Sequence, residues 1–404
     1  MKCSLLIAGL LSLTVTSQAE ILRLQLHNVG KNPAANAFNT LASLGRSGFA
    51  QISFPRPQLP LQGSRSSTPL EEYFSQIATV EFGNPPQSLR LSLDLSSSNT
   101  FVVSSECIQV ACMGSRSFNA SESTTNRRLG RTFTMEGTQG IVSQDTLYIA
   151  SAELFRQEFG EALSFEFFGP GIFGIDGSLG LAYDESIRPG NSVTGRVSVV
   201  RNLLANRYID QPIFALYLGS FRPNAPSGEL TIGGLEHRRF SGTLAWHDVT
   251  RRGQWIVSVK GAAFKYGNRL TRIDFDRIVA PTQVDPDYPL IHLANQPAYY
   301  VNRRLGANRK DKNDEYRRPC EGIDKLESVA ITIDRTNYWF TPEEAFIRAK
   351  DGVTCISIFQ EIPLVSDEER KTRGYEAVLG TVFLRKYYSA YDYGSHLVGF
   401  ALAT

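Results

Sequence analysis

The fold is decided by the stretch Leu89-Arg-Leu-Ser-Leu-Asp-Leu-Ser-Ser-Ser-Asn99, in which leucine occupies every second position from Leu89 to Leu95. This period of two is typical of a half-buried strand. Short stretches of the same kind, such as Val329-Ala-Ile-Thr-Ile-Asp334, follow between glycines and prolines, and helical stretches are few. We therefore predict an all-β protein.

The chain has 404 residues, 42% of them hydrophobic, and a formal net charge of +2. This length indicates about two domains. The near-balanced charge gives no reason to expect nucleic acid or an anionic membrane surface as a partner. The five histidines are scattered without the spacing of metal ligands, so we expect neither a metal nor another cofactor.

The N-terminus is typical of a secretory signal peptide over residues 1–19. Lys2 precedes the apolar run Leu5–Val15, and Ser17-Gln-Ala19 supplies small residues for cleavage. No later apolar run is long enough to span a bilayer, so no membrane anchor is expected. These features predict a secreted protein, or one in the lumen of the secretory pathway or vacuole.

Residues 20–70 differ in composition from the rest, because proline, serine, glutamine and arginine are frequent there. We interpret this region as a prosegment and linker; the alternative is a disordered extension.

Four cysteines remain once Cys3 leaves with the signal peptide. In an oxidising compartment an even set favours disulfides, and four cysteines allow three connectivities. Local pairing, Cys107 with Cys112 and Cys320 with Cys355, is the simplest. The sequon at Asn119 predicts a glycan.

A faint repeat divides the chain. In the first half a strand leads to Asp94-Leu-Ser and later to Ser178-Leu-Gly180; in the second half a strand leads to Ala280-Pro-Thr and later to Val378-Leu-Gly380. We therefore expect two β lobes, residues 71–220 and 221–404.

Several segments, in this order and spacing, resemble the pepsin-like aspartic protease family from Tyr73 nearly to Thr404. They are Tyr73–Ile77, Phe82–Gln87, Leu93–Asn99, Gln144–Thr146, Asp176–Leu181, Gln211–Leu218, Gly228–Gly234 and Val378–Tyr388. The resemblance implies two pseudo-symmetric lobes, a peptide or protein ligand in the cleft between them, and a monomer. Both local cysteine pairs match disulfides of that family, and Ile21–His27 resembles the start of its prosegments.

Members of that family hydrolyse peptides with two aspartates that share a proton, each from an Asp-Thr-Gly or Asp-Ser-Gly loop whose hydroxyl bonds across to the other lobe. Here Asp94 matches the first aspartate. Leu95 and Ser96 replace the hydroxyl residue and the glycine, and Ser97 follows.

An alignment without gaps, placed by Ile278-Val279 and by Pro289, puts Ala280 at the second aspartate, followed by Pro281 and Thr282. Asp285 lies five residues further on, about 16 Å along a strand. We therefore interpret Asp285 and Asp287 as part of a solvated turn.

The segment before Asp145 resembles the hairpin that covers the cleft in that family. Counting back from Asp145 puts Phe133 where the family has a tyrosine.

These departures favour a proteolytically inactive homologue that binds peptide or protein in its cleft. One alternative is an aspartic endopeptidase with residual or atypical activity. Another is a non-proteolytic enzyme that uses Asp94 as a lone acid or base.

Overall fold

The computed structural model describes residues 21–28, 76–135, 137–166, 175–183, 198–219, 228–275, 280–310, 315–362 and 374–404. The predicted signal peptide, most of the predicted prosegment and the predicted boundary near residue 220 lie outside these ranges. None of the helices within them is long and apolar enough to cross a membrane.

The described chain is built mainly of strands, as the alternating pattern predicts. Leu89–Asp94 lies in β3, where the leucines at positions 89, 91 and 93 are buried while the residues between them are half-exposed. The strands of the first lobe are β2 (Gln76–Phe82), β3 (Gln87–Asp94), β4 (Phe101–Val103), β5 (Arg127–Met135), β6 (Thr138–Ile149), β7 (Ala152–Phe165) and β8 (Gly177–Gly180). Helix α2 (Val199–Ala205) packs against β7.

The second lobe contains further sheets. Its strands are β11 (Phe240–Asp248), β12 (Ile256–Tyr266), β13 (Arg269–Asp274), β14 (Ala280–Val284), β15 (Ile291–Leu293), β16 (Arg309–Lys310), β17 (Tyr316–Pro319), β18 (Ser328–Ile333), β19 (Thr336–Phe340), β20 (Phe346–Arg348), β21 (Thr354–Ser357), β22 (Phe359–Glu361), β23 (Ala377–Leu379), β24 (Tyr387–Asp392) and β25 (Leu397–Ala403). Helices α3 (Asn295–Arg304) and α5 (Thr381–Lys386) complete it. One sheet runs β19-β18-β12-β14-β23-β15-β22, and a smaller one runs β16-β17-β21-β20.

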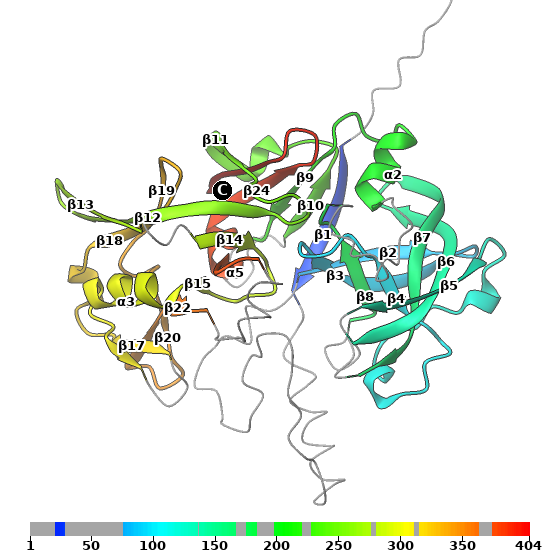
Figure 1. The fold of residues 1–404 in the computed structure, drawn as a ribbon, viewed down its shortest axis with the longest axis horizontal. Coiled ribbons are helices and arrows are strands. Elements are labelled where there is room, and N and C mark those ends of the chain that lie inside the picture. The colour runs from blue at the N-terminus through cyan, green and yellow to red at the C-terminus, as the bar shows by residue number, and fades with distance from the viewer. Residues whose placement is uncertain are drawn as a thin grey trace, which may run out of the picture.

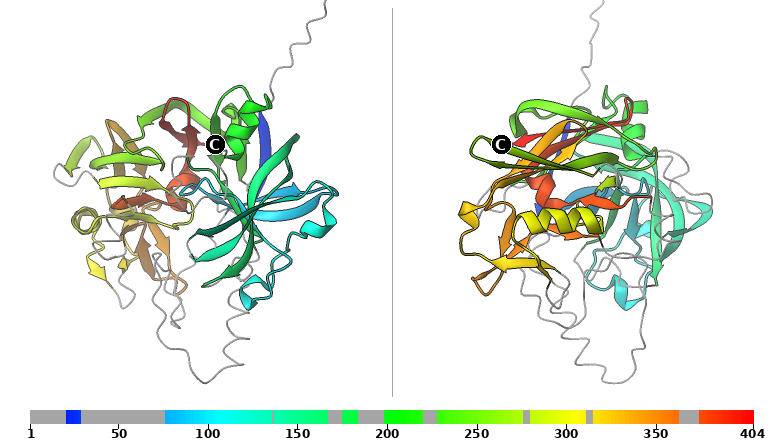
Figure 2. Two further views of the ribbon diagram at one scale, coloured as in Figure 1. Left: turned by 45° about the vertical axis from the view of Figure 1, so that its right-hand side comes forward. Right: turned by 60° about the vertical axis from the view of Figure 1, so that its left-hand side comes forward.

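A sheet common to both lobes connects them, in the order β11-β25-β24-β9-β10-β1-β2-β3-β8-β4-β7-β6-β5. Its middle contains β9 (Ile213–Tyr217), β10 (Glu229–Ile232) and β1 (Leu22–Asn28). Figure 1 shows β1, in blue, between the first-lobe strands and the strands β9, β10 and β24. In both views of Figure 2 the cyan-to-teal strands and the yellow-to-orange elements stay on opposite sides of the molecule. The predicted two-lobed arrangement is therefore confirmed.

The N-terminal strand β1 belongs to this common sheet. It pairs antiparallel with β10 on one side and with β2 on the other, and its leucines at positions 22, 24 and 26 are buried. A segment predicted to be a removable prosegment thus supplies a strand at the junction of the lobes.

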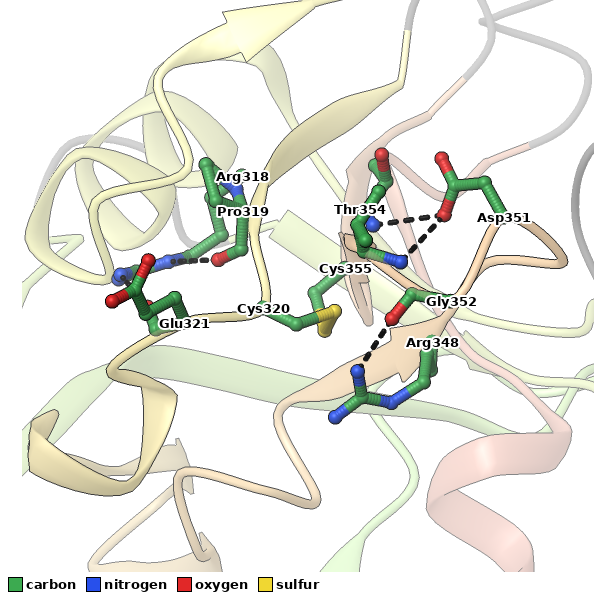
Figure 3. Close-up of a disulfide and its surroundings, with 10 residues drawn as sticks. Arg318, Pro319, Cys320, Glu321, Arg348, Asp351, Gly352, Thr354 and Cys355 are labelled. Carbon is green, nitrogen blue, oxygen red and sulfur yellow. Dashed lines mark hydrogen bonds between the residues drawn. A yellow bond between two sulfur atoms is a disulfide. The ribbon is translucent and has the colours of Figure 1, made fainter.

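Both local disulfides are confirmed. Cys107 bonds to Cys112, and Cys320 bonds to Cys355. The second bond links the residue that follows β17 to β21, and Figure 3 shows it beside the turn in which the Asp351 carboxylate accepts the backbone N–H of Thr354.

Candidate active site

Asp94 lies at the end of β3, where the strand meets β8. The two strands are parallel, with Leu93 opposite Leu179 and Asp94 opposite Gly180. One carboxylate oxygen, Oδ1, accepts hydrogen bonds from Ser96 N at 2.8 Å, Ser96 Oγ at 2.6 Å and Ser97 N at 3.0 Å. These donors fix the orientation of the half-buried Asp94 carboxylate relative to its own loop.

The second lobe contains a similar junction between β14 and β23. These strands are also parallel, with Gln283 opposite Val378 and Val284 opposite Leu379. The backbone N–H of Asp285 donates to the Leu379 carbonyl at 3.2 Å. One further step along this register brings Asp285 to Gly380, just as Asp94 lies opposite Gly180.

The glycine at each junction leaves room for the loop that follows the aspartate. A Cβ at Gly180 would lie 2.3 Å from the carbonyl carbon of Ser98, and a Cβ at Gly380 would lie 2.2 Å from the carbonyl oxygen of Tyr288. Both contacts are too short for any side chain. The same close approach in both lobes agrees with the match between Asp94 and Asp285.

The local geometry of Asp285 also matches that of Asp94. Its Oδ1 accepts the backbone N–H of Asp287, two residues later, at 2.9 Å. Asp285 is buried, with 6% of its surface exposed, whereas Asp287 is exposed. Interpreting Asp285 as part of a solvated turn therefore does not agree with the structure.

Placing Ala280 at the counterpart of Asp94 is corrected by the strand register. Ala280 begins β14 opposite Val259, and Pro281 and Thr282 continue the strand opposite Ser258 and Val257. The gap-free alignment ended the strand too early. The strand runs on to Val284, so its end falls at Asp285.

The sequence carries a signal for Asp285. Leu93-Asp94 and Val284-Asp285 are both an apolar residue followed by aspartate, and each precedes a Leu-Gly pair in its own half of the chain. Neither aspartate is followed by a hydroxyl residue and glycine, which is why the motif alone did not reveal the second one.

The residue directly after each aspartate, Leu95 or Pro286, has an apolar side chain. Leu95 and Pro286 are buried and carry no polar side-chain atom, so neither can donate a hydrogen bond. A residue of β14 nevertheless contacts the loop after Asp94. The side-chain amide Nε2 of Gln283 donates to the Leu95 carbonyl across the lobe boundary at 3.5 Å.

A β-hairpin lies against the Asp94 loop. The last residue of β5, Met135, pairs with the first residue of β6, Thr138, at the turn of this hairpin. Met135 Sδ accepts hydrogen bonds from Asn99 Nδ2 at 3.1 Å and from Ser97 Oγ at 3.8 Å. Phe133 is on β5 and packs in a buried cluster with Met135, Val142 and Ala162. Met135 therefore places the end of this hairpin against the loop that follows Asp94.

The other predicted positions lie away from these loops. Asn119 is half-exposed, and its side-chain amide donates to Glu122 Oε1 at 2.9 Å; its glycosylation stays a prediction. Among the described residues no group of three or more histidine, cysteine, aspartate or glutamate side chains could hold a metal ion.

Comparisons with known proteins agree with this geometry. A sequence model of the family described as eukaryotic aspartyl protease matches residues 72–403. Vacuolar protease A of Aspergillus fumigatus is 31% identical over 82% of this chain and 79% of its own. Vacuolar aspartic protease of Candida albicans is 30% identical over 87% and 80%, and cathepsin E of Aquarana catesbeiana is 31% identical over 82% and 79%. Taken with the paired strand ends at Asp94 and Asp285, the match over nearly the whole region after residue 72 means that this chain belongs to the eukaryotic aspartyl protease family.

Proposed function

We propose that this protein is an aspartic endopeptidase whose catalytic pair is Asp94 and Asp285. The supporting observation is the equivalent place of the two aspartates at the ends of β3 and β14, each beside a glycine of a parallel strand. The inactive homologue that the sequence favoured rested on a missing second aspartate, and Asp285 removes that premise. It also removes the premise for Asp94 as a lone acid or base.

Two carboxylates that approach one another cannot both ionise easily, so the pair shares one proton. The ionised carboxylate then takes a proton from a water molecule, and the protonated one polarises the carbonyl of the peptide bond. Hydrolysis by this route needs an acidic medium and no cofactor. The substrate peptide lies between the lobes, under the β5–β6 hairpin. We place this activity outside the cytosol, after secretion or in the lumen of the secretory pathway or vacuole.

A peptide-binding protein without proteolytic activity is the second candidate. The observation that favours it is the chemistry of the two loops, because Leu95 and Pro286 lack hydroxyls and Ser96 and Asp287 add side chains after each aspartate. Such changes can misplace the carboxylates by the ~1 Å that already costs about a hundredfold in rate.

Cleavage of a denatured protein substrate between pH 3 and pH 6 separates the two candidates. We expect cleavage by the unaltered protein, sensitive to pepstatin, and its loss in both Asp94→Asn and Asp285→Asn. Ala280→Asp is the matched control, and it should leave the activity of the unaltered protein as it is. Binding of pepstatin without cleavage by the unaltered protein would establish the second candidate instead.

A further inference from the structure

Two backbone carbonyls beside Asp94 accept hydrogen bonds from side chains of the second lobe. The Leu181 carbonyl accepts Trp255 Nε1–H at 2.9 Å and the Tyr393 hydroxyl at 2.8 Å. The Leu95 carbonyl accepts the amide of Gln283 at 3.5 Å. All three donor side chains are buried, at 0% exposure for Trp255 and Gln283 and 9% for Tyr393. Hydrogen bonds in such surroundings are little weakened by water.

Leu181 connects two of these donors to Asp94. Its backbone N–H donates to the Asp94 carbonyl at 2.8 Å, while its own carbonyl accepts the hydrogen bonds from Trp255 and Tyr393. Leu181 is thus bonded to Asp94 through its N–H and to the second lobe through its carbonyl. Leu181 therefore connects the backbone of Asp94 to two side chains of the second lobe.

Gln283 connects the two loops more directly. It lies two residues before Asp285 on β14, and its Nε2 donates both to the Leu95 carbonyl and, at 3.3 Å, to the Val284 carbonyl. These carbonyls belong to the residue after Asp94 and the residue before Asp285. A single amide group therefore bridges the backbone on which both carboxylates are mounted.

The cost of burying Gln283 indicates that its amide has a purpose beyond packing. Its Oε1 is buried and finds no hydrogen-bond partner among the described residues. An unpaired buried amide oxygen lowers the stability of the fold. Methionine would fill the same space without an unpaired buried oxygen. The contribution of glutamine at this position is therefore the hydrogen bonds that its Nε2 donates.

The side chains directly after the two aspartates cannot replace these donors. Leu95 and Pro286 follow the two aspartates directly, and neither side chain carries a hydrogen-bond donor. Gln283, Trp255 and Tyr393, which lie outside these two positions, donate side-chain hydrogen bonds across the lobe boundary.

We propose that Gln283, Trp255 and Tyr393 are positioning residues that hold the Asp94 loop at a fixed distance from Asp285. The inference rests on the proposed function, in which these two carboxylates share a proton. Their sharing depends on separation, so the three donors set both the rate and the pH range of hydrolysis.

The variants that test this are Gln283→Met and Tyr393→Phe, which remove a donor and keep the shape of the side chain. Trp255 is less suitable, because it packs against Tyr183 at 4.2 Å and Tyr393 at 5.0 Å between ring centroids, so its loss would also leave a cavity. Tyr217→Phe is the matched control: its hydroxyl donates to the main-chain oxygen of Thr404 at 2.9 Å, away from Asp94, and Tyr217 is 4% exposed.

Steady-state kinetics across acidic pH is the first measurement. We expect kcat to fall about tenfold in each test variant, with KM changed less than twofold and the pH profile of kcat displaced, because a misplaced carboxylate affects the chemical step. Tyr217→Phe should lower the melting temperature about as much as the two test variants do, because it also loses one buried hydrogen bond, and it should leave kcat unchanged. Equal kcat values in all four proteins would overturn the proposal.

Hydrogen exchange provides a readout that does not need activity. The backbone amides of Leu181, Ser96 and Ser97 bond to Asp94, so they should exchange faster in Gln283→Met and Tyr393→Phe than in Tyr217→Phe. If the unaltered protein cleaves nothing, the proposed function fails, and this measurement still decides the positioning role. Unchanged exchange in both test variants would then overturn it.

Discussion

Asp94 and Asp285 each accept on Oδ1 the backbone N–H of the residue two positions later, at 2.8 and 2.9 Å. Each aspartate also follows an apolar residue that is paired in a parallel strand pair, Leu93 with Leu179 and Val284 with Leu379. The two lobes therefore hold their carboxylates by the same backbone arrangement, although the side chains that follow differ. Because Asp285 and not Asp287 matches Asp94 in this arrangement, substitutions at Asp285 and at Asp287 should have different effects on activity.

Asp285→Asn should lower kcat/KM by at least 10²-fold, since general acid–base assistance is worth about 10²–10⁴-fold. Asp287→Ala should keep activity within about threefold, because the group of Asp287 that orients Asp285 is its backbone N–H, which alanine retains. Peptide hydrolysis at acidic pH measures both. Loss of activity in Asp287→Ala with full activity in Asp285→Asn would contradict the assignment.

The attachment of β1 should weaken only at low pH. Hydrogen bonds from the Arg238 and Arg23 guanidinium groups, acting against burial, lower the pKa of Glu236 to about 2. Arg23 is on β1, and its Nε donates to Glu236 Oε2 at 2.6 Å. The pKa of Glu236 in the folded protein lies below its ordinary value of 4.5. The stabilisation that the ionised Glu236 gives to the bound β1 is therefore complete above pH 4.5 and is lost as pH falls toward about 2.

The measurement uses a specific protease site introduced between residues 28 and 76. After cleavage at pH 7 we expect the fragment that contains β1 to co-elute with the rest, held by Leu22, Leu24 and Leu26, and to dissociate increasingly between pH 4.5 and pH 2. In the control Glu236→Gln, retention should be weaker at pH 7 and should change less over that range. Complete dissociation of the unaltered fragment at pH 7 would show that β1 is not held by its own contacts.

Acidification should also destabilise the fold through His292, on β15. Burial lowers the pKa of His292 to about 4, although the hydrogen bond to the Glu361 carbonyl, at 3.1 Å, opposes this. The unfolded chain takes up a proton near pH 6.5, whereas the folded chain does so only near pH 4. Stability is therefore complete above pH 6.5 and falls between pH 6.5 and pH 4. His292→Gln should flatten the decline in melting temperature over this range, and an identical decline in both proteins would refute this role.

The two disulfides should contribute unequally to stability. The bond between Cys320 and Cys355 closes a separation of 35 residues, and that between Cys107 and Cys112 closes one of 5. On the chain-entropy argument these loops stabilise the fold by about 4 and about 2 kcal/mol. Denaturant unfolding of the paired serine variants measures the difference. A larger loss for the Cys107–Cys112 pair would mean that native contacts of that loop, rather than loop length, dominate.

The sequence by itself determined the β class, because the leucine alternation of β3 is local information. Of three possible cysteine connectivities, the sequence favoured local pairing as the simplest. The two lobes and Asp94 were indicated by motifs that are each continuous in the chain. Phe133 could be placed in the hairpin for the same reason, since its spacing to Asp145 lies within one pair of adjacent strands.

Only the tertiary structure decided the counterpart of Asp94. Ala280 and Asp285 are both compatible with the sequence, because the residues after each lack the hydroxyl and glycine that would mark a loop. The choice depends on where β14 ends, and that point is set by its pairing with β23, which follows about ninety residues later. The same holds for Gln283, Trp255 and Tyr393. Their donors reach carbonyls beside Asp94 only because two lobes, each with its own strand register, are packed against one another.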